Sequence, residues 1–178
     1  MFLTLSAAIH GGLSAGANFA ASLPKEEMKF LTALPIELRL GYRFFVKGVE
    51  GLFIDPVFIL NTSWDEGPKP GYKPPFVDAK LSGVQLRIGK AWKEKRVAVF
   101  GLLDAVDFGY QTWSNTDFKV KINIGVGLEW GFSPYASLVA NLKLGFGEAR
   151  AIGFYETKEA VGGGVLVGLE FHSSKYYS

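Results

Sequence analysis

The sequence predicts an all-β fold: an eight-stranded antiparallel up-and-down transmembrane β-barrel that occupies residues 1–178 as a single domain. Three observations lead to this prediction. Apolar and polar residues alternate with a period of two over eight segments, the links between these segments are short and long in turn, and aromatic residues gather at the ends of the apolar stripes.

The alternation is clearest from Phe118 to Phe132, where every even position is apolar and every odd position is polar or glycine. A period of two places successive side chains on opposite faces of a strand, so this segment has one apolar and one polar face. In chain order, the predicted strands span residues 3–19, 36–44, 52–64, 84–88, 96–110, 118–132, 137–146 and 161–171.

Two of these segments alternate less regularly, and their facing is set by single acidic residues. We place Asp55 on the polar face of the third segment and Asp104 on the polar face of the fifth. Pro35 and Pro56 fall within strands and lack the N–H of a ladder hydrogen bond, so we expect a β-bulge at each.

The links between the segments indicate how the barrel would sit in a membrane. Short links lie near 46–51, 93–96 and 132–135, and longer ones near 22–29, 65–80, 110–117 and 147–159. Short turns on one side and long loops on the other are typical of outer-membrane barrels, and an even strand number puts both termini on the short-turn side. We therefore predict that 65–80 and 147–159 lie outside the cell and offer sites for an extracellular ligand or protein.

The apolar faces are predicted to contact lipid, although a soluble barrel or β-sandwich would alternate in the same way with its apolar face inward. The aromatic residues that end the apolar stripes are Tyr42, Phe44, Trp92, Trp130, Phe132 and Phe171 at the short-turn end, and Trp64, Phe118 and Phe146 at the other end. The middle of the stripes is expected to be aliphatic. Because aromatic rings prefer the headgroup level of a bilayer, this distribution favours a membrane barrel.

The charged residues of the polar faces are predicted to meet inside the barrel. They are Glu37, Arg39, Arg43, Asp55, Arg87, Asp104, Lys119, Lys121, Glu129, Lys143 and Glu170. The two signs are nearly balanced, as they must be if enclosed charges are to find partners. We expect this network to fill the lumen, and a polar channel is the alternative.

The stretch from Gly125 to Leu138, GVGLEWGFSPYASL, joins a glycine-spaced strand and aromatic residues to a Ser-Pro turn and a returning strand. It resembles small outer-membrane β-barrels, similar to the transmembrane domain of OmpA and to OmpX- and OmpW-like proteins. The resemblance implies the outer membrane of a bacterium, or of a related organelle, as the location. Residues 1–21 have neither the positive start nor the continuous apolar run of a signal peptide, so no export signal is predicted in this chain.

Composition argues against several other classes of function. A net charge of +2 does not favour nucleic-acid binding, and zero cysteines and two histidines do not favour a metal centre. We predict a monomer in a lipid bilayer, with no cofactor and no catalytic residue. An alternative with less support is a lipid-modifying acyl hydrolase, because the run His172-Ser173-Ser174 resembles the His-x-Ser pair of lipid A deacylases; we expect this run to be a solvated chain end.

The predicted role is structural or interactive, through the long loops. A porin-like channel for small solutes is one alternative to this role, and a soluble, lipocalin-like carrier of an apolar ligand is another.

Overall fold

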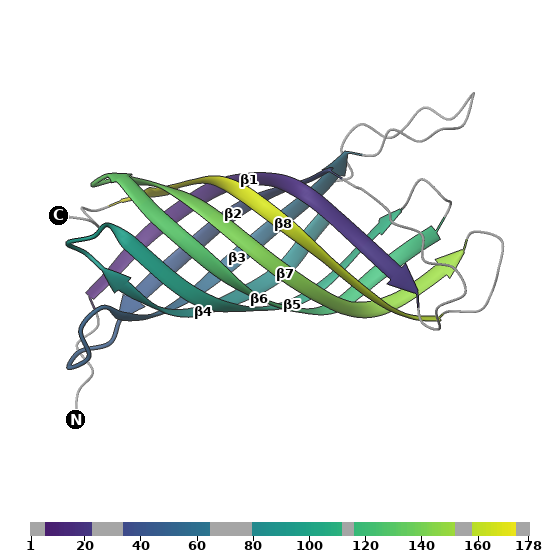
Figure 1. Cartoon of the computed structure of the whole chain (residues 1–178), viewed down its shortest axis with the longest axis horizontal. Coiled ribbons are helices and arrows are strands. Elements are labelled where there is room, and N and C mark those ends of the chain that lie inside the picture. The colour runs from purple at the N-terminus through teal and green to yellow at the C-terminus, as the bar shows by residue number, and fades with distance from the viewer. Residues whose placement is uncertain (1–5, 23–33, 65–79, 112–115, 152–157, 174–178) are drawn as a thin grey trace.

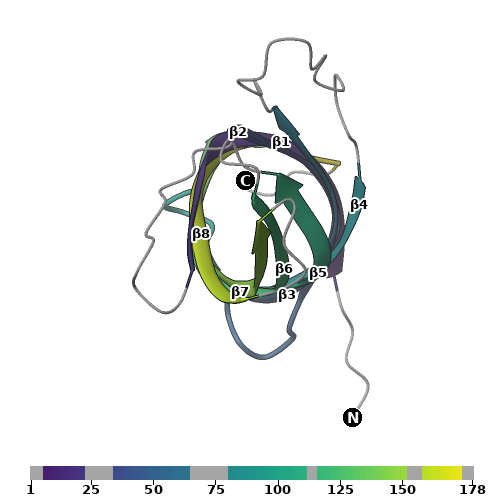
Figure 2. The same ribbon diagram turned by 90° about the vertical axis from the view of Figure 1, so that its right-hand side faces the viewer.

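The computed structural model describes residues 6–22, 34–64, 80–111, 116–151 and 158–173, which form a closed barrel of eight antiparallel strands (Figures 1 and 2). The strands are β1 (Ser6–Ser22), β2 (Leu34–Phe45), β3 (Leu52–Trp64), β4 (Lys80–Trp92), β5 (Val97–Gln111), β6 (Thr116–Ser133), β7 (Ala136–Ala151) and β8 (Lys158–His172). Each strand pairs with the next one in the chain, and β1 pairs with β8 to close the ring. This confirms the predicted fold class. Helices of the length and apolarity needed to cross a bilayer are absent from these residues.

Three tight turns join the strands at one end of the barrel, which we call the turn end. They span 46–51, 93–96 and 134–135, and β1 begins and β8 ends beside them (left in Figure 1). Gly48 and Gly51 in the first turn have φ angles of 91° and 71°, a left-handed conformation that glycine adopts without strain. The main-chain oxygen of Gly51 accepts a hydrogen bond from Ala91 N at 2.8 Å, which ties this turn to β4.

The predicted long links lie largely outside the described residues, but their bounds need correction. Residues 147–151 belong to β7 and residues 158–159 to β8, so the predicted 147–159 link is shorter at both ends. The pairs Thr116↔Ala151 and Ala149↔Lys158 show why, since the ladders continue past the last clearly alternating residues. Backbone pairing extends strands where the side-chain pattern has already ended.

The bulges expected at Pro35 and Pro56 are wrong. The register between β2 and β3 is the same at Gly41↔Val57 as at Phe44↔Ile54, with the ladder interrupted between these two pairs. Pro56 still pairs with Leu86 of β4. A missing N–H removes a bond toward one neighbouring strand only, so the sheet tolerates the proline without inserting a residue. Register shifts occur instead at Ile59/Leu60, Ala105/Phe108, Val120/Ile122 and Gly131/Ser133.

The exterior of the barrel is apolar and the interior is largely polar. Outward side chains such as Leu40, Val126 and Leu142 are 50–58% exposed, whereas inward ones such as Arg43 and Glu129 are fully buried. This reverses the usual distribution in water-soluble proteins, in which buried charged residues are rare.

An aromatic layer closes the interior at the turn end. Phe45, Phe53 and Phe100 stack edge to face with centroid separations of 6.3 Å, together with the small side chains of Ala91 and Ala98. The polar lumen that the sequence predicts does not include this layer. Alternation tells which face a residue occupies, but not that an inward position is apolar for a packing reason.

Candidate functional site: the ionic network inside the barrel

Nine of the eleven charged residues predicted for the lumen have described side chains, and all nine are buried inside the barrel. They are Glu37, Arg39, Arg43, Asp55, Arg87, Asp104, Glu129, Lys143 and Glu170. Lys119 and Lys121 belong to β6, but their side chains lie outside the described part of the chain. These nine side chains point inward because every second residue of a strand faces the same side of the sheet.

Arg43 of β2 joins carboxylates from three other strands. Its Nη2 lies 2.9 Å from Asp55 Oδ2, and its Nη1 lies 2.9 Å from Glu129 Oε2. Its Nη2 is also 3.5 Å from Glu170 Oε1. The guanidinium rests on the aromatic layer, with its central carbon 4.2 Å from the ring centre of Phe53. A planar group with five N–H donors suits this position, since it bonds acids on several sides at once.

Glu170 of β8 is the second junction of the network. Its Oε2 is 2.9 Å from Arg87 Nη1 and 3.6 Å from Arg39 Nε. The guanidinium of Arg87 also stacks on the aromatic layer, 5.0 Å from the ring centre of Phe100. With Arg43, three arginines therefore share this carboxylate, and a neutral substitution at Glu170 would leave each of them with one acidic partner fewer.

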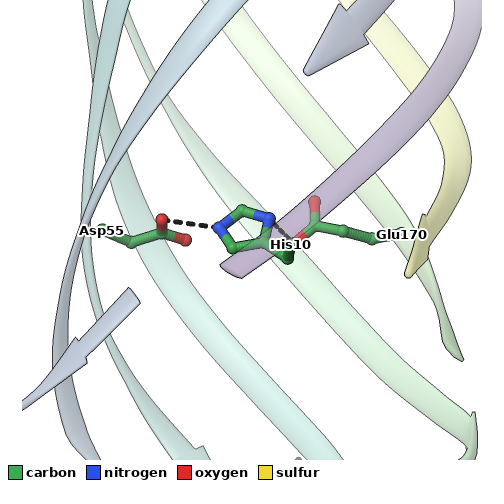
Figure 3. A group of neighbouring side chains, drawn as sticks. All are labelled: His10, Asp55 and Glu170. Carbon is green, nitrogen blue, oxygen red and sulfur yellow. Dashed lines mark hydrogen bonds and ion pairs between the residues drawn. The ribbon is translucent and has the colours of Figure 1, made fainter. Parts of the chain in front are cut away.

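His10 of β1 lies between two carboxylates from different strands (Figure 3). Its Nε2 is hydrogen-bonded to Asp55 Oδ1 at 2.7 Å. Its Nδ1 is 2.9 Å from Glu170 Oε1, within the distance of an ion pair. The imidazole therefore contacts one carboxylate on each side and links β1 to β3 and β8.

A second group of contacts lies further from the turn end, around Lys143 of β7. Its ammonium is 2.8 Å from Glu37 Oε2 and 2.9 Å from Asp104 Oδ2. Asp104 accepts a hydrogen bond of 2.6 Å from Gln85 Nε2, and Gln85 Oε1 accepts one from Arg87 Nε. Gln85 thus connects the Lys143 group with the Arg43 and Glu170 groups.

The described interior is close to electrically neutral. Five carboxylates (Glu37, Asp55, Asp104, Glu129 and Glu170) face four permanent cations (Arg39, Arg43, Arg87 and Lys143). Because an unpaired charge is costly in a closed, low-dielectric space, this near-balance of fixed charges is what an enclosed network requires.

Two sets of side chains are close enough together to hold a metal ion: His10, Asp55 and Glu170, and Glu129, Glu170 and His172. Their carboxylates are already neutralised by guanidinium groups, from Arg43 on Asp55 and Glu129 and from Arg87 on Glu170. A metal ion would have to displace these cations. We therefore assign both sets to the ionic network.

His172 was expected to be part of a solvated chain end, and this expectation is wrong. Its ring is buried, with Nε2 3.0 Å from Glu129 Oε1 and 3.2 Å from Ser137 Oγ. β8 continues through His172, which pairs with His10 across the seam, while Ser173 is exposed. His172 lies two residues after Glu170, so the period-two pattern of β8 places its side chain on the same inward face. In a hydrolase relay the acid holds Nδ1 and Nε2 takes the proton of serine, whereas here Nε2 faces both groups.

Neutral polar side chains, which are not among the predicted lumen residues, complete the network. Asn123 donates to Asp104 at 3.3 Å, and Ser137 donates to Glu129 at 2.8 Å. Both satisfy carboxylate lone pairs that the cations leave open, as buried acids require. The sequence pattern places both residues on the inward face of their strands. It does not indicate which carboxylate each of them would bond.

The predicted interface aromatics point outward wherever their side chains are described. Tyr42, Trp92, Trp130, Phe132, Phe146 and Phe171 are exposed, and Phe44 is half-buried. The side chains of Trp64 and Phe118 lie outside the described residues. Phe58, which is 60% exposed midway along β3, contradicts the expectation of a purely aliphatic middle.

Comparisons with known proteins yield likeness of fold only. No family model matches the sequence, and no curated protein matches it. The structure is similar to that of Neisserial surface protein A, with 15% identity, a TM-score of 0.45, and coverage of 96% of this chain and 99% of that chain. It is also similar to Ail, the attachment invasion locus protein of Yersinia pestis, with 11% identity, a TM-score of 0.43, and coverage of 93% and 97%.

Neither similarity is high enough to transfer the role of any residue to this chain. The predicted architecture, a closed ring of eight antiparallel strands, is confirmed by the strand pairing of this chain itself.

Proposed function

We propose that this chain is an outer-membrane β-barrel with a closed interior, and that its role is structural or interactive, through the links at the end opposite the turns. The observation that carries the proposal is the reversed distribution of polarity. Large apolar side chains cover the outside of all eight strands, and ion-paired charges fill the described inside. A contiguous apolar exterior of this extent is unfavourable in water and favourable in lipid.

A soluble carrier of an apolar ligand receives little support from the interior. Such carriers line their cavity mainly with hydrophobic side chains, which match the ligand. The largest fully buried side chains here include Arg43, Arg87, Glu37 and Glu129. An apolar ligand would have to displace these groups from their ion pairs.

A small-solute channel also receives little support, because eight strands enclose only enough space for side chains. Arg43 and Arg87 bridge between strands on opposite sides of the ring, as in the pairs Arg43–Glu129 and Arg87–Glu170. The aromatic layer adds a second obstruction beneath them.

The membrane location is tested by fractionating cells that express the chain and by comparing boiled and unboiled samples on detergent gels. A barrel should co-sediment with membranes and should run as a compact species that shifts only on boiling. A chain that stays monodisperse in buffer without detergent would contradict the proposal.

The proposed role of the links is tested with protease added to intact cells. Cleavage is expected within 65–79 and 152–157, with the 93–96 turn protected. Cleavage at 93–96 instead would reverse the proposed orientation, and binding partners would then have to be sought at the turn end.

A further inference from the structure

A groove lies at the turn end, between the β2–β3 turn and the β4–β5 turn. It has a volume of about 1030 Å³ and is lined by residues 45–51 and 90–95. Phe45 and Ala91 of the aromatic layer line the inner side of the groove, so this layer lies between the groove and the charged interior. Trp92 connects the groove with the apolar exterior, since it lines the groove and is 40% exposed on the outside of β4. The groove therefore begins at the belt of outward apolar side chains and leads over the rim of the barrel.

Cations outnumber anions along this groove. Lys47, Lys90, Lys93 and Lys95 line it, together with Glu50 and Glu94. The ammonium of Lys90 lies 5.6 Å from the ring centre of Trp92, and that of Lys93 lies 5.2 Å from the ring centre of Phe45. These ring contacts hold two positive charges against the rim of the barrel, Lys90 beside the outward Trp92 and Lys93 beside Phe45 of the aromatic layer.

We infer that the groove binds the headgroup of an anionic phospholipid from the leaflet at the turn end, with the acyl chains lying along the apolar exterior beside Trp92. The inference rests on the proposed membrane location. Continuity between the groove and the apolar belt favours a lipid over a soluble anion. The excess of lysines favours a headgroup with net negative charge over a zwitterionic one, whose own cation would meet the lysines.

The test uses bromine quenching of a single tryptophan in lipid vesicles. Trp92 is retained while Trp64, Trp113 and Trp130 are replaced by phenylalanine, and the barrel is inserted into mixed vesicles of phosphatidylcholine and phosphatidylglycerol. The brominated acyl chains are carried by one lipid or by the other. Brominated phosphatidylglycerol should quench Trp92 more strongly at equal mole fraction. A lysine near an anionic headgroup contributes a preference of about fivefold, and added salt should reduce it.

Matched lysine variants assign the preference to the groove. Lys90→Gln with Lys93→Gln should lower the quenching ratio severalfold, whereas Lys158→Gln, at the first residue of β8 and the opposite end of the barrel, should leave it unchanged. A ratio that survives the double substitution, or that falls equally in Lys158→Gln, would overturn the inference. So would competition by inorganic phosphate at the concentration of the lipid.

Insertion into pure phosphatidylcholine vesicles separates the two proposals. If the barrel fails to insert and shows no heat-modifiable migration, the membrane location itself fails. If it inserts and Trp92 shows no preference between the two headgroups, only the lipid site fails.

Discussion

At the scale of single residues, Glu170 is the most connected acid in the described interior, with contacts to His10, Arg39, Arg43 and Arg87. Glu170→Gln keeps the size of the side chain and removes its charge. Because it takes one acidic partner from each of these enclosed cations, we expect the free energy of unfolding to fall by about 3 kcal/mol, near the lower bound for breaking a buried pair. Urea unfolding of the barrel in lipid vesicles measures this change.

The control for Glu170→Gln is Glu50→Gln, at an exposed position in the 46–51 turn. A surface substitution of this kind should change the unfolding free energy by less than about 0.5 kcal/mol. Equal effects of the two substitutions would show that the interior charges are solvated and that the network contributes little.

A second prediction at this scale compares two glycines, Gly41 on the inward face of β2 and Gly101 on the outward face of β5. A Cβ on Gly41 would meet the ring of His10 and would lie 3.0 Å from Asp55 Oδ1, whereas at Gly101 the nearest atom, Ile88 O, would be 3.9 Å away. Gly41→Ala should therefore destabilise the barrel by about 1–3 kcal/mol, as overpacking does, and Gly101→Ala should be nearly neutral. The same unfolding assay tests both, and the reverse order would contradict the assigned facing.

At the scale of strands, the outward apolar positions near mid-barrel make a prediction about lipid contact. Leu40→Arg, Val126→Arg and Leu142→Arg should each reduce the stability of the inserted barrel by about 2–4 kcal/mol, because arginine near the bilayer midplane is costly in a β-barrel. Val49→Arg is the control, since Val49 is 51% exposed but lies in a turn. The proposed lipid face would be wrong if all four variants inserted into vesicles equally well.

The strands and their facing are the part of the structure that the sequence predicts well. The alternation of apolar and polar residues located all eight strands and gave the correct facing of Asp55 and Asp104. Facing is strongly specified by sequence, because a shift of one residue would move every side chain of a strand to the opposite face. It did not give the partners. Besides Asp55 on the neighbouring strand β3, Arg43 meets Glu129 from β6, and that second pairing depends on how the ring closes. Closure is a property of all eight strands, which no single segment encodes.

At the scale of the whole molecule, the filled interior predicts that the barrel does not conduct ions. The wild type should be silent in planar bilayers. A variant that combines Phe53→Ala and Phe100→Ala, which opens the aromatic layer, together with Glu129→Ala, which weakens the network, should show leak currents and lower heat resistance. Stable, single-sized openings in the wild type would instead favour the channel alternative.

The seam between β1 and β8 has a consequence for how the chain folds. The two histidines face each other there, as the pair His10↔His172, and Glu170 in the last strand bonds Arg43 and Arg87, 127 and 83 residues earlier. These contacts form only after the two ends of the chain have met. The chain therefore loses the entropy of closing long loops before the contacts can offset that loss. Partly assembled sheets should therefore be poorly populated, and assembly should be slow and all-or-none.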